Sequence, residues 1–158
     1  MILFFHAARL ALVVFDPYLS SRPLAEAFRS APPGKLIVDH HYYYFSSVIF
    51  YTGQDPLLLN GKFNNLEYGA AAPGAPAVFL NDSEFKELWT SANRYYLVAS
   101  QAGADRMEGV VGKGRFLMVA TSGGKFLLTN TGTENSPDSL PTSPRPTVAS
   151  AVGPRPRK

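Results

Sequence analysis

Three adjacent side chains that could hold a metal follow a short apolar run near the start of the chain. Residues 36–38 (Leu-Ile-Val) predict a buried strand, and Asp39, His40 and His41 come directly after it. Carboxylate and imidazole groups are common metal ligands, and α/β proteins place such groups where their strands end. The first question is therefore whether the chain carries a metal site at this point.

The remaining acidic residues argue against a metal. The triplet resembles the one that follows a strand in the DHH phosphoesterases, which bind manganese through it and through further aspartates. Such a site needs carboxylates on other strands, including an upstream Asp-x-Asp, whereas the only acidic residues before Asp39 are Asp16 and Glu26, and neither lies at a predicted strand end. We expect no metal and no cofactor, and we interpret Asp39, His40 and His41 as a polar strand end that caps the next helix.

The composition narrows the class of protein. A chain of 158 residues that is 46% hydrophobic and 17% charged suits a globular or membrane-associated protein, and the absence of cysteine excludes disulfides and thiolate metal sites. The net charge is +3, but residues 131–158 hold four basic and two acidic side chains, which leaves a surplus of only one positive charge for the rest. A surface that binds nucleic acid through its phosphates is therefore not expected.

The first 15 residues are apolar except for His6 and Arg9. They are too few to span a bilayer, which takes about 20 apolar residues. A signal peptide is disfavoured because Arg9 lies in the middle of the segment and no small-residue cleavage site follows it. We favour the interpretation that residues 1–20 are the end of a transmembrane helix and its exit from the membrane, with the helix stopping at Asp16 and Pro17. The alternative is a core helix.

Strand-like and helix-like patterns alternate over residues 21–130. Helical spacing occurs at residues 21–30, 42–52, 81–91 and 103–112, and strand patterns at 35–39, 56–60, 77–80, 94–100, 115–121 and 125–130. Asn81 and Glu84 have the spacing of a capping box. We predict one α/β domain, a three-layer Rossmann-like sheet flanked by helices with a C-terminal β-hairpin, in which the tyrosines at 42–44, 95 and 96 pack in the core. Residues 131–158, with six of the thirteen prolines, are predicted to form a disordered tail.

One connection between predicted elements is unusually long. Residues 61–76 show no periodicity, and loops of this length in a domain are usually functional or disordered. Phe63, Leu66 and Tyr68 should anchor it. The side chains that we expect to bind substrate are Asn60, Asn64, Asn65, Glu67 and Tyr68. They could contact a sugar, or they could instead satisfy the backbone of the loop itself.

Four stretches together resemble a known family. They are "FDPYLSSRPLAEAF", "YYYFSSVIFYTGQDPLLLNGKFNNLEYG", "APGAPAVFLNDSEFKELW" and "RYYLVAS". In this order they are similar to the soluble carboxy-terminal region of bacterial multi-spanning glycosyltransferases of the aminoarabinose transferase and protein O-mannosyltransferase type. The resemblance covers roughly residues 5–130. Ala70 and Ala71 depart from it, because the family has a serine and an aromatic residue there.

The resemblance implies a function for the chain. Members of the family transfer sugars from polyprenyl-phosphate donors, and their catalytic carboxylate lies among membrane helices. By resemblance the chain is an accessory domain without catalytic residues of its own, anchored to the inner membrane by residues 1–15 and facing the periplasm or cell exterior. Its partners would be the membrane-embedded part of the enzyme and a polyprenyl-phosphate sugar. The alternative is an independent small α/β protein, either a ligand-binding protein or a hydrolase, and an upstream reading frame with ten or more hydrophobic spans would distinguish the two.

Overall fold

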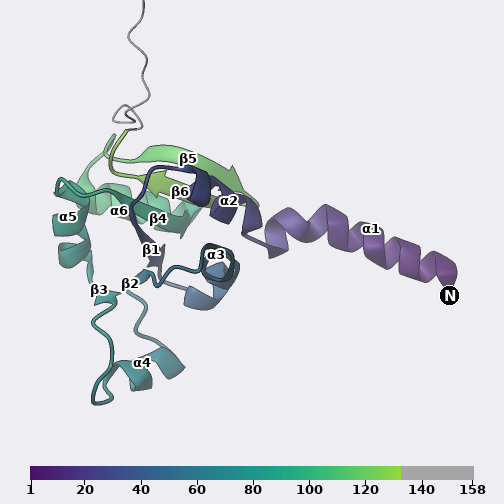
Figure 1. Ribbon diagram of the computed structural model, residues 1–158, viewed down its shortest axis with the longest axis horizontal. Helices are drawn as coiled ribbons and strands as arrows, with labels where there is room; N and C mark the ends of the chain where they lie inside the picture. The colour runs from purple at the N-terminus through teal and green to yellow at the C-terminus, as the bar shows by residue number, and fades with distance from the viewer. Residues whose placement is uncertain (133–158) are drawn as a thin grey trace, which may run out of the picture.

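A six-stranded sheet forms the centre of the computed structural model, which describes residues 1–132 (Figure 1). The strands are β1 (Lys35–Asp39), β2 (Leu57–Leu59), β3 (Phe79–Leu80), β4 (Tyr95–Ser100), β5 (Leu117–Ser122) and β6 (Lys125–Thr129). Their order in the sheet is β3-β2-β1-β4-β6-β5. The first four are mutually parallel, whereas β6 runs antiparallel to both β4 and β5. The predicted α/β sheet and its C-terminal hairpin are confirmed.

Helices cover both faces of this sheet. The 3₁₀-helix η1 (Tyr42–Phe45) and the helices α2 (Arg22–Ser30) and α3 (Ser46–Thr52) share one hydrophobic core with Val38 of β1. Helices α5 (Asp82–Thr90) and α6 (Gln101–Val111) share a second core with Ile37, the preceding residue of the same strand. Because successive side chains of a strand point to opposite faces, these two cores lie on opposite sides of the sheet. The three-layer arrangement is therefore confirmed.

The chain changes direction within the sheet between β1 and β4. From β1 it proceeds through β2 to β3 at one edge, and it then returns to place β4 on the other side of β1. Sheets of this kind bind ligands in the crevice outside the carboxyl ends of the strands at such a reversal point. The topology thus directs attention to the residues that follow β1 and β4.

Helix α1 (Ile2–Leu19) projects away from the sheet (Figure 1). Its apolar side chains are exposed, Leu3 to 84% for example, and none belongs to either core. The expectation that the helix stops at Asp16 and Pro17 is wrong: α1 continues to Leu19, and its last turn closes with Ser20 N–H donating to the carbonyl of Asp16 at 2.7 Å. No helix within residues 1–132 is long and apolar enough to cross a membrane.

The long connection contains regular structure that its sequence does not reveal. Helix α4 (Asn65–Ala70) lies within residues 61–76. A helix of six residues is too short for the apolar spacing that predicts longer ones. Phe63 and Leu66 are half-buried and anchor the segment as expected, but Tyr68 is 81% exposed and does not. The predicted disordered tail lies outside the described residues, apart from residues 131 and 132.

The predicted capping box of α5 is confirmed, and it gives a first testable expectation. The side chain of Asn81 accepts hydrogen bonds from the backbone N–H groups of Ser83 and Glu84 at 2.9 and 3.0 Å, and Glu84 accepts one from Asn81 N–H at 2.8 Å. We expect Asn81→Ala to lower the free energy of unfolding by about 1 kcal/mol in urea denaturation. The exposed Lys86→Ala in the same helix is the control and should change it by less than about 0.5 kcal/mol. Equal effects of the two substitutions would contradict the role of the cap.

Candidate functional site

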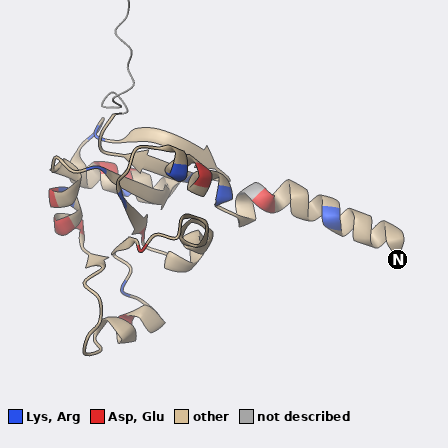
Figure 2. Cartoon of the chain, in the orientation of Figure 1, with Lys and Arg blue, Asp and Glu red and all other residues tan. Residues whose placement is uncertain are grey.

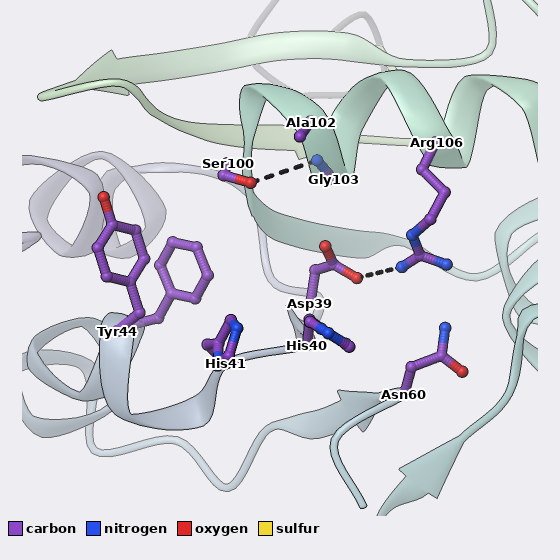
Figure 3. A pocket seen from close by; sticks show the side chains of 10 residues that line it. Asp39, His40, His41, Tyr44, Asn60, Ser100, Ala102, Gly103 and Arg106 are labelled. Carbon is purple, nitrogen blue, oxygen red and sulfur yellow. Dashed lines mark hydrogen bonds and ion pairs between the residues drawn. The ribbon is translucent and has the colours of Figure 1, made fainter. Parts of the chain in front are cut away.

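A cavity of about 610 Å³ opens at the carboxyl ends of the parallel strands (Figure 3). Asp39 ends β1, Asn60 follows β2, and Ser100 ends β4. Gly103 and Arg106 of α6 line the same cavity. The cavity therefore lies at the reversal point between β1 and β4. We call this cavity the crevice.

Two carboxylates flank one guanidinium at this crevice. Arg106 donates to Asp39 Oδ1 at 2.5 Å and to Asp82 Oδ1 at 2.8 Å, and Asn60 Nδ2 donates to the same oxygen of Asp82 at 2.6 Å. The Asp39 side chain is only 5% exposed, whereas that of Arg106 is 38% exposed. Burial raises the pKa of Asp39, and the positive charge of Arg106 opposes that rise. These four side chains, Asp39, Asn60, Asp82 and Arg106, connect the ends of β1 and β2 with α5 and α6.

The second carboxylate oxygen of Asp39 lies against α6. A Cβ atom at Gly103 would overlap Asp39 Oδ2, so only glycine allows the helix to approach this closely. Among residues 1–132, no group donates a hydrogen bond to Oδ2. The predicted capping role of this strand end is wrong, because His41 precedes η1 without a side-chain hydrogen bond and Asp39 turns toward α6 instead.

The residues after β1 and β2 adopt backbone conformations that are uncommon outside glycine. His40 has φ 58° and Asn60 has φ 52°, both in the left-handed region. His40 N–H nevertheless completes the parallel ladder by donating to Leu59 O at 2.8 Å. The imidazole of His40 is exposed, and His40 and His41 line the crevice together with Asp39.

The two imidazoles pack against each other and against Phe63 of the long connection in edge-on or tilted arrangements. The rings of His40 and His41 lie 4.9 Å apart, and Phe63 lies 5.0 and 4.9 Å from them. Within residues 1–132, no three histidine, aspartate or glutamate side chains are placed to share a metal ion. The expectation that the triplet binds no catalytic metal stays a prediction, and metal analysis of the purified protein would test it.

The five predicted substrate-binding residues do not form one cluster. Of these five, Asn60 is the member that lines the crevice. Asn65 accepts a hydrogen bond from the hydroxyl of Tyr43 at 2.5 Å, and Asn64, with φ 55°, precedes α4. Glu67 and Tyr68 are exposed on α4.

Sequence reasoning missed several residues of the crevice, namely Ser100, Ala102, Gly103 and Arg106. The position of Ser100 at the end of a predicted strand could have indicated it, since the same rule pointed to Asp39. Arg106 carries no such local signal, because it is one of several charged side chains on a predicted helix.

Tyr44 lies on the side of the crevice opposite Arg106 (Figure 3). Its ring covers the ammonium group of Lys125, which lies 4.8 Å from the ring centroid and donates to the carbonyl of Tyr18 at 3.1 Å. Lys125 is buried, and this burial lowers its pKa. Lys125 thus joins the end of α1 to the crevice wall.

The prediction that the tyrosines pack in the core is confirmed for some of them only. Tyr95 and Tyr96 are buried, whereas Tyr43 and Tyr44 are 52% and 51% exposed. The difference follows from position: residues 95 and 96 belong to a central strand, and residues 43 and 44 belong to a 3₁₀-helix at the surface.

The sheet order, the helices on both faces and the crevice define a doubly wound α/β domain. Two solved structures share this fold. One is the crystal structure of ArnT from Cupriavidus metallidurans in the apo state, with a TM-score of 0.52, 18% identity, and coverage of 69% of this chain and 19% of ArnT. The other is the same enzyme bound to undecaprenyl phosphate, with a TM-score of 0.53, 16% identity, and coverage of 73% and 20%.

This chain thus spans about a fifth of the length of ArnT. No protein-family model and no curated protein sequence matches it. The resemblance to the aminoarabinose transferase type that the sequence indicated is confirmed as a shared fold.

Proposed function

We propose that this chain is an accessory extracytoplasmic domain of a membrane glycosyltransferase that uses a polyprenyl-phosphate sugar, and that it shapes or covers the active site. The observation that carries the proposal is the fold shared with one fifth of ArnT, an enzyme whose structure was solved with undecaprenyl phosphate bound. The chemistry would belong to the membrane-embedded part, and no catalytic residue is assigned to this domain.

Helix α1 supports a membrane-side partner. Most of its surface carries no charge, and Arg9 and Asp16 are its charged residues (Figure 2). Large exposed side chains occur along its whole length, from Ile2 to Leu19. Burying each of these side chains fully is worth roughly 1.5 to 3 kcal/mol, so an apolar environment would stabilise the helix strongly. We infer that residues 1–15 contact the bilayer or the membrane-embedded part of the enzyme, near the inner membrane.

The long connection supports a surface that meets substrate. The side chains that we propose as substrate contacts are Asn60, Asn64, Asn65, Glu67 and Tyr68. The contact of Phe63 with His40 and His41 holds the start of this segment beside the crevice, while the ring of Tyr68 remains free to stack on a sugar. Asparagine amides and a carboxylate supply the hydrogen bonds that sugar hydroxyls require.

A chimeric enzyme tests the proposal. Residues 1–132 of this chain would replace the matching fifth of ArnT, and transfer from a polyprenyl-phosphate sugar would be measured in detergent. We expect the chimera to retain at least about a tenth of the parent activity, a barrier increase below about 1.4 kcal/mol. The control carries an unrelated α/β domain of similar size and should be inactive, as should this chain alone. A folded, membrane-inserted chimera without activity, or turnover by this chain alone, would contradict the proposal.

The same chimera tests the proposed contacts. Glu67→Ala and Tyr68→Ala, both at exposed positions, should lower turnover by about tenfold with little change in stability. The control is the exposed Lys86→Ala, which should leave turnover unchanged. A loss below about threefold would show that the segment is structural.

The second candidate function is that of an independent ligand-binding protein or hydrolase. The crevice favours this candidate, because a ligand could bind in the crevice without a membrane partner. A chain that remains monodisperse without detergent and binds a small ligand, together with an inactive chimera, would support this reading.

A further inference from the structure

The crevice contains polar groups that the described part of the protein leaves available. Asp39 Oδ2 receives no hydrogen bond, although the side chain that bears it is 95% buried. Ser100 Oγ accepts from Gly103 N–H at 3.3 Å, but within residues 1–132 its own hydroxyl hydrogen has no acceptor. Asn60 uses its amide nitrogen on Asp82, and its carbonyl oxygen is likewise unpaired in this range.

These free groups favour a ligand that both donates and accepts hydrogen bonds. Asp39 Oδ2 and Asn60 Oδ1 can only accept, so the ligand must donate to them, and the Ser100 hydroxyl can donate to a ligand oxygen. Neighbouring hydroxyl groups on one ring satisfy both requirements, since each can donate and accept. A ligand hydroxyl could donate to Asp39 Oδ2 while Oδ1 keeps its hydrogen bond from Arg106.

The charge balance of the crevice disfavours an anion. Arg106 is the guanidinium at the cavity, and both of its ion pairs are with carboxylates, Asp39 and Asp82. The guanidinium charge is therefore already balanced. A phosphate at the crevice would find no unpaired guanidinium there, although the start of α6 by itself attracts anions.

The cavity also provides an apolar wall and enough space. Tyr44 lies on the side opposite Arg106 (Figure 3). Phe45 also lines the cavity, and its ring lies 5.0 Å from that of Tyr44, edge to face. Tyr44 is half-exposed and is held in place by Lys125. Sites of roughly 300 to 1,000 Å³ accept small organic ligands, and this one measures about 610 Å³.

We propose that the crevice binds the ring of a neutral monosaccharide, with its hydroxyls on Asp39, Asn60 and Ser100 and one face of the ring toward Tyr44. This site is separate from the exposed residues of α4, and it shares Asn60 with the substrate contacts proposed above. It stands on the groups of the crevice and does not depend on the proposed enzyme.

Titration of the full chain followed by amide NMR tests the site. The probes are methyl β-D-xylopyranoside and methyl α-D-glucopyranoside as neutral rings, and D-glucosamine and inorganic phosphate as charged comparisons. We expect at least one neutral sugar to cause saturable shifts at the amides of Asp39, Ser100 and Gly103 at millimolar concentration. Neither D-glucosamine nor phosphate should bind more tightly than that neutral sugar.

Two variants and one control complete the test. Tyr44→Ala should weaken sugar binding by about fivefold or more, while Tyr43→Ala, equally exposed but outside the cavity, should not. Asn60→Gly removes the amide and keeps the left-handed backbone, and it should weaken binding similarly even if Tyr44→Ala folds poorly. Absence of saturable shifts with both neutral rings, tighter binding of phosphate or glucosamine, or equal loss in Tyr43→Ala would overturn the proposal. None of these outcomes bears on the chimera, which measures transfer and not binding to this chain.

Discussion

Replacing Gly103 by alanine is expected to lower the free energy of unfolding by about 2 to 4 kcal/mol. The new Cβ atom would overlap Asp39 Oδ2 and would lie 3.3 Å from the Cβ of Ala99. Asp39 cannot simply move, because its other oxygen is held by Arg106 and its side chain is buried. Either α6 shifts away from β1 or the ion pair breaks, and both outcomes cost stability. Urea denaturation of the full chain measures the effect.

The same helix provides a matched control for Gly103→Ala. Gly109 also lies within α6, but a Cβ atom there would meet nothing within 4 Å. Gly109→Ala should therefore stabilise the protein by about 0.5 to 1 kcal/mol, the usual gain of alanine over glycine inside a helix. In an Asp39→Ala background the cost of Gly103→Ala should largely disappear, since the overlapping carboxylate is absent. A stabilising effect of Gly103→Ala in the unaltered protein would show that α6 does not approach β1 as closely as described.

Replacing Arg106 by alanine is expected to lower the free energy of unfolding by about 2 kcal/mol at neutral pH. The substitution leaves the Asp39 carboxylate buried without its partner. Breaking a fully buried pair costs roughly 3 to 5 kcal/mol, and the smaller figure applies because Arg106 is 38% exposed and water can partly replace it.

The pH dependence of this loss has a definite sign. Burial raises the pKa of Asp39 in the folded protein above its ordinary value of 3.8, so the folded state binds this proton more tightly than the unfolded state. The contribution of Asp39 to stability is then fully present below the unfolded pKa and declines as pH rises through the folded pKa. Without Arg106 the folded pKa should rise further, so the substitution should cost much more at neutral pH than near 3.8.

Urea denaturation of the unaltered protein and of Arg106→Ala at several pH values between 3.8 and neutral would measure how the cost of the substitution depends on pH. The double variant Asp39→Asn with Arg106→Ala is the control, because its side chain at 39 cannot ionise and its stability should lack this part of the pH dependence. A cost of Arg106→Ala that is the same at all pH values would contradict a buried, ionisable Asp39.

Elements that depend on neighbouring residues could be predicted from the sequence. The apolar run of residues 36–38 predicted β1, and the spacing of Asn81 and Glu84 predicted the start of α5, because strand burial and helix capping depend on residues a few positions apart. The alternation of such elements was enough for the three-layer α/β class, and the longer stretches resembled the family whose fold the chain shares.

The side chains that meet in the crevice could not be predicted from the sequence, because they come from distant parts of the chain. Asp39 and Arg106 are 67 positions apart, and they pair because β4 returns beside β1 and carries α6 with it. The three adjacent residues that suggested one metal site all line the crevice, but Asp39 pairs with Arg106, whereas the two imidazoles pack against Phe63. The periodicity of a sequence describes which face of one helix or strand is buried. Strand order and backbone turns decide which side chains of different elements meet, and both depend on contacts between distant parts of the chain.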